Sequence, residues 1–305
     1  MAQDIEKSVF KVLVTGAATG FGRMLCEALA DKGHQVYAGM RDPEGRHADA
    51  VESMHSWSSK RIHPIVPLQL DVTSGTSVRE AFEEIRHMAG GVDCVVNNAG
   101  VTAVGLGADM PLDHAAKLFE TNVLGAQRVN MAALPHMRSQ KAGLLVHISS
   151  SFGRFVVPGM GLYCASKAAL EVIAESFRYE LAPLGIDSII VEPGAFPTGM
   201  SARVLTPKFP GSEKKHGTSA GIPQHLQEHF EGLFNSKKPP NPKAVVQTII
   251  DLISMPNGLR PLRTVVDPHS GHAVESFNRA SVQAQAQAMA SLGLANIPKG
   301  PPFKA

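Results

Sequence analysis

Apolar runs of strand length alternate along the chain with segments that have the spacing of amphipathic helices. The runs are rich in aliphatic and β-branched residues, as expected of strands that are covered on both faces in a parallel sheet. Seven segments have this character: Val9–Thr15, His34–Met40, His63–Asp71, Val92–Asn98, Gly143–Ser150, Gly185–Pro193 and Arg263–Asp267.

Helical patterns occupy most of the intervals between these runs. They are Gly20–Lys32, Ser74–Met88, Asp113–Arg138, Tyr163–Leu184, Pro242–Ile253 and Val282–Leu294, and the polar stretch Arg41–His63 is interpreted as a helix plus a loop. A repeated βα order with right-handed crossovers predicts an α/β fold with a doubly wound parallel sheet and helices on both faces. We expect a single Rossmann-type domain over residues 1–305, with about seven strands in the order 3-2-1-4-5-6-7.

The pattern loosens after Pro193. Residues 198–242 contain six prolines and include the loop-like sequences KKHGTSAG and NSKKPPNP. We interpret 198–242 as a lid over the substrate, 9–200 as the cofactor-binding and catalytic core, and 268–305 as a C-terminal extension.

Composition limits the possible partners and compartment. Of the 305 residues 44% are hydrophobic and 18% charged, and the net charge is +2, which indicates a soluble protein and gives no electrostatic case for binding nucleic acid or membrane. The three cysteines are far apart and form no C-x-x-C pair, so neither a disulfide framework nor a zinc site is indicated. With no signal peptide or transmembrane run in evidence, a cytoplasmic location is expected.

The sequence TGAATGFG, residues 15–22, stands where the first strand passes into the first helix. Gly16 would allow the tight turn, Gly20 a close approach of the backbone to a pyrophosphate, and Gly22 the packing of helix on strand. Thr19 and Phe21 lie within the same turn. Free N–H groups and the positive end of the helix dipole would face the phosphates, so this turn predicts a dinucleotide site rather than a purely structural turn.

The end of the second strand bears on the choice of dinucleotide. An NAD-binding fold usually has an acid here for the ribose hydroxyls, whereas this chain has Met40 followed by Arg41. Arginine can bind a 2′-phosphate with two hydrogen bonds, and Asp42 comes one residue too late for the acid. NADP is therefore favoured, and NAD remains possible.

Two further strand ends would line the cofactor channel at the carboxyl edge of the sheet. Asp71 and Val72 end the third strand and would lie beside the adenine, although Asp71 could instead cap the helix near Ser74. The fourth strand ends in NNAG, from which Asn98, Ala99 and Gly100 are expected to contact the cofactor.

With TGxxxGxG, NNAG and YxxxK in this order, the chain resembles the short-chain dehydrogenase/reductase family over roughly Val9 to Met200. The resemblance implies a nicotinamide cofactor and a catalytic tetrad, here Asn122, Ser150, Tyr163 and Lys167; Ser149 and Ser151 are neighbours that could be confused with Ser150. It also implies that the segment after the sixth strand contacts the nicotinamide, through Pro193, Gly194, Phe196 and Thr198.

The residues of the YxxxK motif can be given chemical roles. Four residues of helix return to nearly the same face, so Tyr163 and Lys167 can face one cleft, where the ammonium and the nicotinamide charge would favour the phenolate. Tyr163 is then the general acid/base, and Ser150 can donate a hydrogen bond to the carbonyl oxygen. Lys167 can also hold the ribose, and Asn122 is expected to link it to solvent through water.

Apolar residues between Ser150 and Tyr163 are candidates for the substrate pocket. Besides these two, we assign Phe152, Phe155, Met160 and Met200 to substrate binding; Val156 and Val157 are further candidates, and Val204, Leu205 and Phe209 could close over the substrate with Met200. Their character favours a hydrophobic substrate.

The remaining candidates point to simpler interpretations. His216, His225 and His229 lack a fixed third ligand and are interpreted as solvated, and Cys164 as packed rather than reactive, so no metal is expected. The sequence predicts an NADP-dependent oxidoreductase that interconverts an alcohol and a ketone or aldehyde. A homodimer or homotetramer is expected, because family members often pack the long helices around Asn122 and Tyr163. The alternatives are an NAD-dependent dehydrogenase, an epimerase, dehydratase or enoyl reductase on the same fold, and a non-catalytic cofactor sensor.

Overall fold

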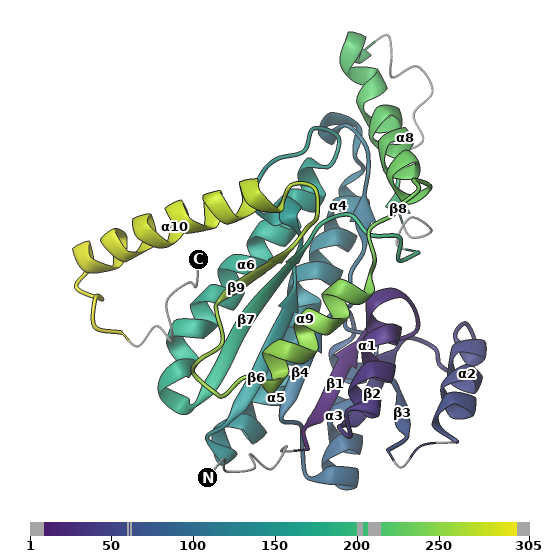
Figure 1. The fold of residues 1–305 in the computed structure, drawn as a ribbon, viewed down its shortest axis with the longest axis vertical. Helices are drawn as coiled ribbons and strands as arrows, with labels where there is room; N and C mark the ends of the chain where they lie inside the picture. Colours follow the sequence, from purple (N-terminus) through teal and green to yellow (C-terminus); the bar gives the residue numbers. More distant parts are fainter. Residues whose placement is uncertain (1–8, 60, 62, 200–203, 207–214, 298–305) are drawn as a thin grey trace.

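The structure is a computed structural model that describes residues 9–59, 61, 63–199, 204–206 and 215–297. Its centre is a seven-stranded sheet in the order β3-β2-β1-β4-β6-β7-β9, and every neighbouring pair is parallel (Figure 1). In chain order the strands are β1 Lys11–Thr15, β2 Gln35–Met40, β3 Ile65–Gln69, β4 Cys94–Asn97, β6 Gly143–Ile148, β7 Ile186–Pro193 and β9 Arg263–Val266. The predicted doubly wound sheet and its strand order are confirmed.

Helices cover both faces of this sheet and create two separate apolar cores. The helices α1 Gly20–Asp31, α2 Ala48–Ser58 and α9 Lys243–Ser254 pack on one face, and α3 Gly75–Ala89, α5 Gly125–Gln140 and α6 Gly161–Leu181 on the other. Alternate strand residues serve the two cores: on β1, Val12 and Val14 face the first and Leu13 the second. This two-sided burial explains why the strands read as continuous apolar runs.

The helix expected over residues 113–138 is interrupted. It begins as α4 Leu112–Phe119, passes through a π-helical segment Glu120–Leu124, and continues as α5. The π-helical segment contains the buried Asn122, whose amide pairs with the backbone of Val101 rather than with its own helix. A π-bulge of this kind is often found at a functional site.

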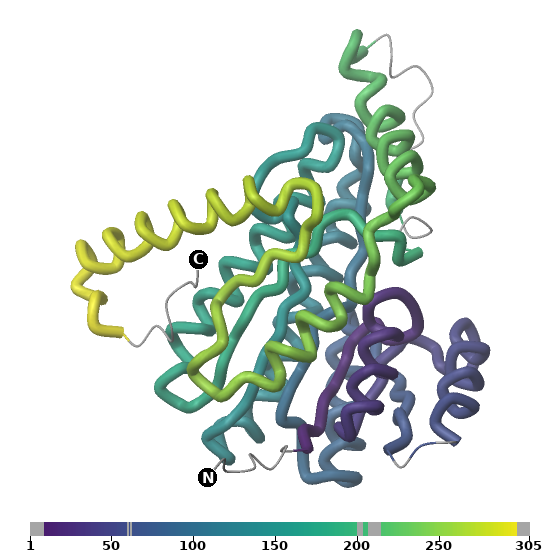
Figure 2. Tube along the Cα trace, viewed as in Figure 1, coloured from purple at the N-terminus to yellow at the C-terminus, as the bar shows by residue number. Residues whose placement is uncertain are grey.

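Three features differ from the expected organisation. A second, two-stranded sheet pairs β5 Thr102–Ala103 with β8 Val204–Leu205 in parallel. The supposedly loop-like stretch 198–242 contains the helix α8 Ile222–Phe234, which stands beside the carboxyl edge of the sheet. The last helix, α10 Gly271–Ser291, starts eleven residues earlier than the sequence pattern indicated (282 against 271) and leads away from β9 along the chain path shown in Figure 2.

A buried cluster of charged side chains joins the C-terminal end of α6 to the sheet. Asp187 on β7 is 3% exposed and accepts hydrogen bonds from Arg178 of α6 at 2.8 Å and from Arg260 at 2.7 Å. The same carboxylate accepts from the backbone N–H of Gly258 at 3.0 Å. One anion therefore balances two guanidinium groups that are themselves almost fully buried.

Replacing Asp187 by Asn removes the negative charge that pairs with the two buried guanidinium groups of Arg178 and Arg260. We expect the free energy of unfolding to fall by about 3 kcal/mol in urea denaturation. The matched control is Asp31→Asn, because Asp31 pairs with Arg61 through side chains that are 55% and 33% exposed. That variant should change stability by less than about 1 kcal/mol, and equal losses in the two variants would contradict the assigned role of Asp187.

Candidate active site

The turn between β1 and α1 lies against the end of β4. Gly16 and Gly20 have positive φ angles of 67° and 60°, which favour glycine. A Cβ on Gly16 would lie 2.8 Å from Cα of Ala99, and a Cβ on Gly22 would lie 2.6 Å from Nδ2 of Asn98. The glycines thus allow two backbone segments to approach more closely than any side chain would permit.

Hydrogen bonds hold these two segments together. Asn98 donates from Nδ2 to the carbonyl oxygens of Thr15 at 2.8 Å and Gly16 at 3.2 Å. In return Oγ1 of Thr15 accepts from the backbone N–H groups of Asn98 and Ala99, at 3.1 and 3.0 Å. Asn98 therefore has a structural role in shaping the edge of the cleft.

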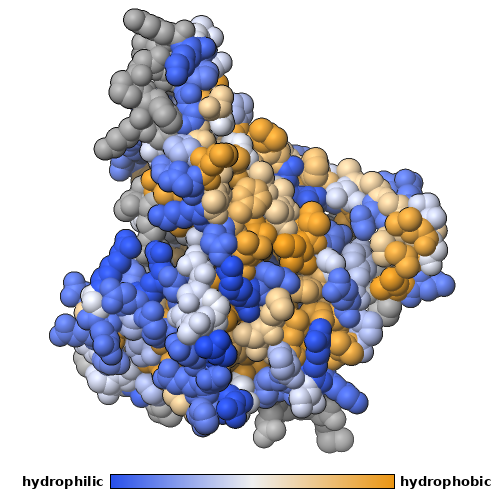
Figure 3. Space-filling model, turned by 180° about the vertical axis from the view of Figure 1, so that it is seen from behind, coloured by the Kyte–Doolittle hydropathy of each residue, from blue (hydrophilic) through white to orange (hydrophobic). Residues whose placement is uncertain are grey.

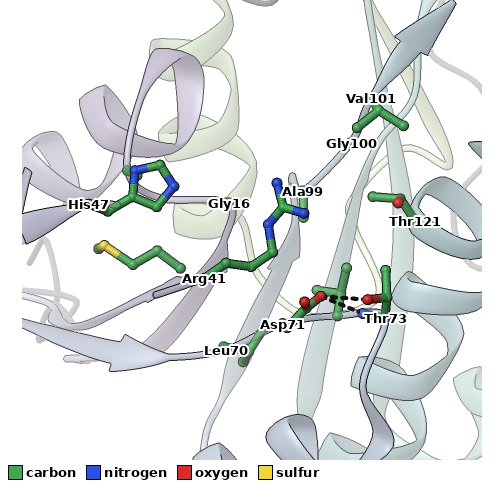
Figure 4. A pocket seen from close by; sticks show the side chains of 13 residues that line it. Gly16, Arg41, His47, Leu70, Asp71, Thr73, Ala99, Gly100, Val101 and Thr121 are labelled. Carbon is green, nitrogen blue, oxygen red and sulfur yellow. Dashed lines mark hydrogen bonds between the residues drawn. The ribbon is translucent and has the colours of Figure 1, made fainter. Parts of the chain in front are cut away.

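The expected cofactor residues line two adjoining pockets that share Gly16, Ala99 and Gly100. One is drawn in Figure 4, where the side chain of Arg41 extends into the space between His47 and Asp71. Besides the shared residues, its lining includes Met40, Arg41, Asp71 and Val72. The second pocket adds Thr19, Gly20, Phe21, Asn98 and Thr198.

Arg41 and His47 line the pocket in Figure 4, whereas Asp42, the carboxylate of the turn after β2, is not part of its lining. Asp42 has a positive φ of 49°, and its carboxylate accepts from the backbone N–H groups of Gly45 at 3.1 Å and Arg46 at 2.8 Å. Its oxygens are thus used within its own turn. His47 also lines this pocket, a residue that the sequence analysis did not single out because it stands in the poorly patterned stretch before α2.

Asp71 does not cap the following helix. Ser74 is the N-cap of α3 and accepts from the N–H of Ser77 at 3.2 Å. The carboxylate of Asp71 instead accepts from the N–H and the hydroxyl of Thr73, at 2.9 and 2.8 Å, and so stays at the pocket wall. This arrangement favours the cofactor alternative for Asp71.

The segment after β7 reaches back toward the glycine turn. The carbonyl oxygen of Thr198 lies 2.9 Å from where a Cβ on Gly20 would stand, and the ring of Phe196 contacts that of Phe21 edge-to-face at 5.7 Å. Gly194 donates from its N–H to Val266 on β9 at 3.0 Å, directly after the strand's last residue, Pro193. The expected nicotinamide segment therefore lies beside the turn, and Met200 lies outside the described residues.

The four expected catalytic residues are all buried and come from three elements: Asn122 from the π-helical segment, Ser150 from the end of β6, and Tyr163 and Lys167 from α6. Of the three consecutive serines, Ser150 is the one that lowers the pKa of Tyr163. Ser149 bonds to Glu171 and Ser151 to Asp267 instead, at 2.7 Å each.

Gly100 lies between Asn122 and Lys167. A Cβ at this glycine would stand 3.3 Å from Oδ1 of Asn122 and 3.7 Å from Nζ of Lys167, so the two side chains reach the same point from opposite elements. Asn122 donates to Val101 O at 2.9 Å and to Ser166 Oγ at 3.0 Å, and Lys167 donates to Ile148 O at 2.8 Å. The positions fit a relay between the two, and no direct bond joins them among the described contacts.

The net effect of the protein's own groups is to raise the pKa of Tyr163. Burial raises the pKa of Tyr163 to about 12, against a smaller opposite effect of its hydrogen bond with Ser150. Burial lowers the pKa of Lys167 to about 8, partly offset by the carboxylate of Glu171. Nζ of Lys167 is 5.9 Å from the centre of the Tyr163 ring. The expected phenolate therefore does not arise from Lys167 alone.

An apolar cluster continues from Tyr163 toward α8. It includes Met160 and Tyr163 in its buried part and Phe152, Leu226 and Phe230 around it. The rings of Phe152 and Phe155 meet at 5.7 Å, those of Phe152 and Phe230 at 6.3 Å, and Phe230 stacks on Phe234 at 6.3 Å.

The remaining pocket and lid candidates differ in burial. Of the pocket candidates, Val157 packs around this cluster and Val156 is 76% exposed. Of the lid candidates, Leu205 packs around the cluster and Val204 is half-buried in β8. Phe209 lies outside the described residues. Helix α8 forms one wall of the cluster. The sequence analysis interpreted this segment as part of a loop-like lid and not as a helix.

The structure also places the histidine and cysteine candidates. Within the described ranges no three His, Cys, Asp or Glu residues are close enough to hold a metal ion. His216 pairs with Asp109 at 2.9 Å, while His225 and His229 are exposed. All three cysteines are free and buried. No helix in the described part of the chain is long and apolar enough to cross a membrane.

Comparison with known proteins identifies relatives across most of the chain. A family model described as short chain dehydrogenase matches residues 11–208. A 3-ketodihydrosphingosine reductase of Bacteroides thetaiotaomicron is 32% identical over 211 residues, which are 68% of this chain and 72% of the relative. Retinol dehydrogenase 5 of Mus musculus is 35% identical over 199 residues, 64% of this chain and 59% of the relative.

A solved structure shares the whole architecture. A short-chain dehydrogenase from Streptomyces avermitilis superposes with a TM-score of 0.75 at 28% identity, covering 95% of this chain and 98% of that chain.

Substituting Gly22 by Ala tests the close approach that forms the cleft. The new methyl group would stand 2.6 Å from both Nδ2 of Asn98 and the carbonyl oxygen of Gly16, forcing the turn away from β4. We expect NADPH affinity, measured by fluorescence titration, to fall about tenfold or more. Gly75→Ala is the control, because nothing lies within 4 Å of its added Cβ. Unchanged affinity in the Gly22 variant would contradict this account.

Proposed function

The chain belongs to the short-chain dehydrogenase/reductase family of oxidoreductases, and we propose that it is an NADP-dependent enzyme that interconverts an alcohol and a ketone or aldehyde. The observation that carries the proposal is the convergence of Ser150, Tyr163, Lys167 and Asn122 beside the pockets formed by the glycine turn. A cofactor sensor would not require this complete set of groups.

The tyrosine is suited to act as the proton donor. When bound, the nicotinamide supplies the hydride for carbonyl reduction or accepts it in alcohol oxidation. In reduction Tyr163 gives its phenolic proton to the substrate oxygen, and Ser150 donates a hydrogen bond to the same oxygen as negative charge develops there. A pKa of about 12 keeps the phenol of Tyr163 protonated near neutral pH, which favours reduction.

Lys167 completes the proton path. Burial brings the pKa of Lys167 to about 8, so the ammonium form predominates at neutral pH and can return a proton to Tyr163. Asn122 approaches the same point near Gly100, where a water molecule would continue the path to solvent. In the oxidative direction the charge of Lys167, together with that of a bound oxidised nicotinamide, would favour the phenolate of Tyr163.

The pocket around Arg41 supports NADP over NAD. Arg41 and His47 give this pocket its basic side, while Asp42 uses its carboxylate within its own turn. A 2′-phosphate would gain a bidentate partner in Arg41, whereas ribose hydroxyls would find no carboxylate at the end of β2.

The apolar cluster beside Tyr163 supports a mostly hydrophobic small molecule as substrate. Phe152, Phe155 and Met160 adjoin the catalytic residues, and α8 extends the apolar surface with Phe230 and Phe234. The names of two relatives specify retinol and a ketosphingoid base, both largely apolar molecules with one reacting oxygen group.

A second copy of the chain is the proposed partner, in a homodimer or homotetramer. Seen from behind, the molecule has a broad band of apolar side chains across its middle (Figure 3). Large apolar residues exposed on α4, the π-helical segment, α5 and α6 are Leu112, Leu124, Met131 and Val172. Burying these residues against the same helices of another copy would remove them from water.

Tyr163→Phe removes the proton donor and keeps the ring. We expect NADPH oxidation with responsive ketones or aldehydes to fall by at least about a hundredfold, because proton transfer loses its positioned acid. NADPH binding, followed by fluorescence, should be unchanged. Retention of most of the rate would exclude Tyr163 as the acid, and inactivity of the unaltered protein across a broad carbonyl panel would instead support a cofactor sensor.

Arg41→Asp replaces the proposed phosphate partner with a group that can accept from ribose hydroxyls. We expect the ratio of kcat/KM for NADPH to that for NADH to fall by about tenfold or more, through loss of a charge-assisted contact and repulsion of the phosphate. Arg46→Asp makes the same charge change in the same turn, away from the pocket lining. If both variants keep the original preference, Arg41 does not select the cofactor.

A further inference from the structure

The loop that carries Ser150 is held by polar partners on each side of this serine: the buried Glu171 and the partly buried Asp267. Ser149 donates to Oε1 of Glu171 on α6, and Ser151 donates to Oδ2 of Asp267 after β9, both at 2.7 Å. All three serines are buried. The position of Ser150 therefore depends on groups that themselves touch neither the cofactor pockets nor the apolar cluster.

Glu171 is the central partner of this arrangement. It is fully buried, and its two oxygens have different partners: Oε1 accepts from Ser149, while Oε2 accepts from Arg263 on β9 at 3.2 Å and from Arg154 at 3.4 Å. Gly153 lets the carboxylate approach the loop, since a Cβ there would lie 2.5 Å from Oε1. The carboxylate joins the serine loop, α6 and the edge strand at one point.

Glu171 also follows Lys167 by one helical turn. Tyr163, Lys167 and Glu171 are spaced by four residues on α6, and all three are buried, so they form one row on the inner face of the helix. The charge of Glu171 raises the pKa of Lys167 against the larger, opposite effect of burial. The same carboxylate thus acts on two catalytic residues, on Ser150 through the loop and on Lys167 through its charge.

Charged and polar groups from several elements surround Glu171. Glu192 on β7 accepts from Asn278 of α10 at 2.6 Å, and burial together with the charge of Glu171 raises the pKa of Glu192 to about 8. Arg154 and Arg263 pair with Glu171, and each also lies within salt-bridge distance of Glu192, at 3.8 and 3.6 Å. Arg263 pairs in addition with Glu175, which is one turn further along α6.

We propose that Glu171 is a positioning residue for catalysis, which fixes the Ser150 loop through Ser149 and places a carboxylate one helical turn from Lys167. The proposal rests on the reaction proposed above, because it assigns Glu171 a role toward two of that reaction's residues. Glu171 itself does not touch the reacting atoms.

The test is Glu171→Gln, which keeps the shape and most of the hydrogen bonds but removes the charge. We expect kcat for carbonyl reduction to fall about tenfold, because the serine loop loses its charge-assisted anchor. Reduction requires protonated Lys167, so activity declines as pH rises through the pKa of Lys167. Without the nearby carboxylate that pKa is lower, and the decline should move about one pH unit toward acid. Glu171→Asp should restore the position of the decline.

Two variants separate this role from simple structural support. Glu175→Gln removes an equal charge from the same arginine, one turn further from Lys167, and should leave the pH profile unchanged. Ser149→Ala cuts the link to the loop but keeps the charge, so kcat should fall with no movement of the decline. The proposal is overturned if Glu171→Gln and Glu175→Gln shift the profile equally, or if Ser149→Ala and Glu171→Gln both retain full kcat.

A measurement without turnover keeps this test independent of the reaction. In protein labelled with ¹³C at the lysine ε-carbons, the signal of Lys167, assigned with a Lys167→Met variant, reports its protonation directly. The signal should titrate at lower pH in Glu171→Gln than in the unaltered protein. An identical titration would refute the electrostatic role, whereas inactivity of the unaltered protein would refute the proposed reaction alone.

Discussion

The close approach between the β1–α1 turn and the end of β4 is the constraint on which the cleft depends. The side-chain amide of Asn98 donates to the carbonyl oxygens of Thr15 and Gly16. Oγ1 of Thr15 accepts two hydrogen bonds from the backbone N–H groups of Asn98 and Ala99, at the end of β4. These contacts require glycine where a Cβ would meet backbone atoms. Since β4 lies between β1 and β6 in the sheet, the same contacts set the distance from the cofactor turn to Ser150 at the end of β6.

The sequence predicted the sheet well because burial on both faces leaves an unmistakable pattern. Each strand ended within about two residues of its expected limits, and the order of strands follows from the handedness of the crossovers. The catalytic and cofactor motifs are short and local, so their residues could be named before the structure. What brought them together is the shared carboxyl edge of parallel strands, which the βα order alone implies.

Other features depend on contacts between distant parts of the chain, and no local pattern reports them. Prolines on both sides of α8 make this segment look like a loop in the sequence. Pro223, however, lies in the first turn of the helix, where proline is tolerated. The helix is stabilised by the packing of Leu226 and Phe230 on the apolar cluster. No local sequence pattern indicates the π-helical segment either, because the side-chain amide of Asn122 is hydrogen-bonded to the backbone of Val101, twenty-one residues earlier in the chain. The raised pKa of Tyr163 reflects burial, which spacing on a helix cannot reveal.

Helix α10 determines when, during synthesis, the polar network around the serine loop can be completed. Asn278 donates to Glu192, and its amide oxygen accepts from Arg154 at 2.6 Å, so the network around the serine loop includes a residue of the last helix. During synthesis the YxxxK motif leaves the ribosome more than a hundred residues before Asn278 (167 against 278). A nascent chain can therefore form the glycine turn and β4 early, but it cannot complete the support of its serine loop until Asn278 has been translated.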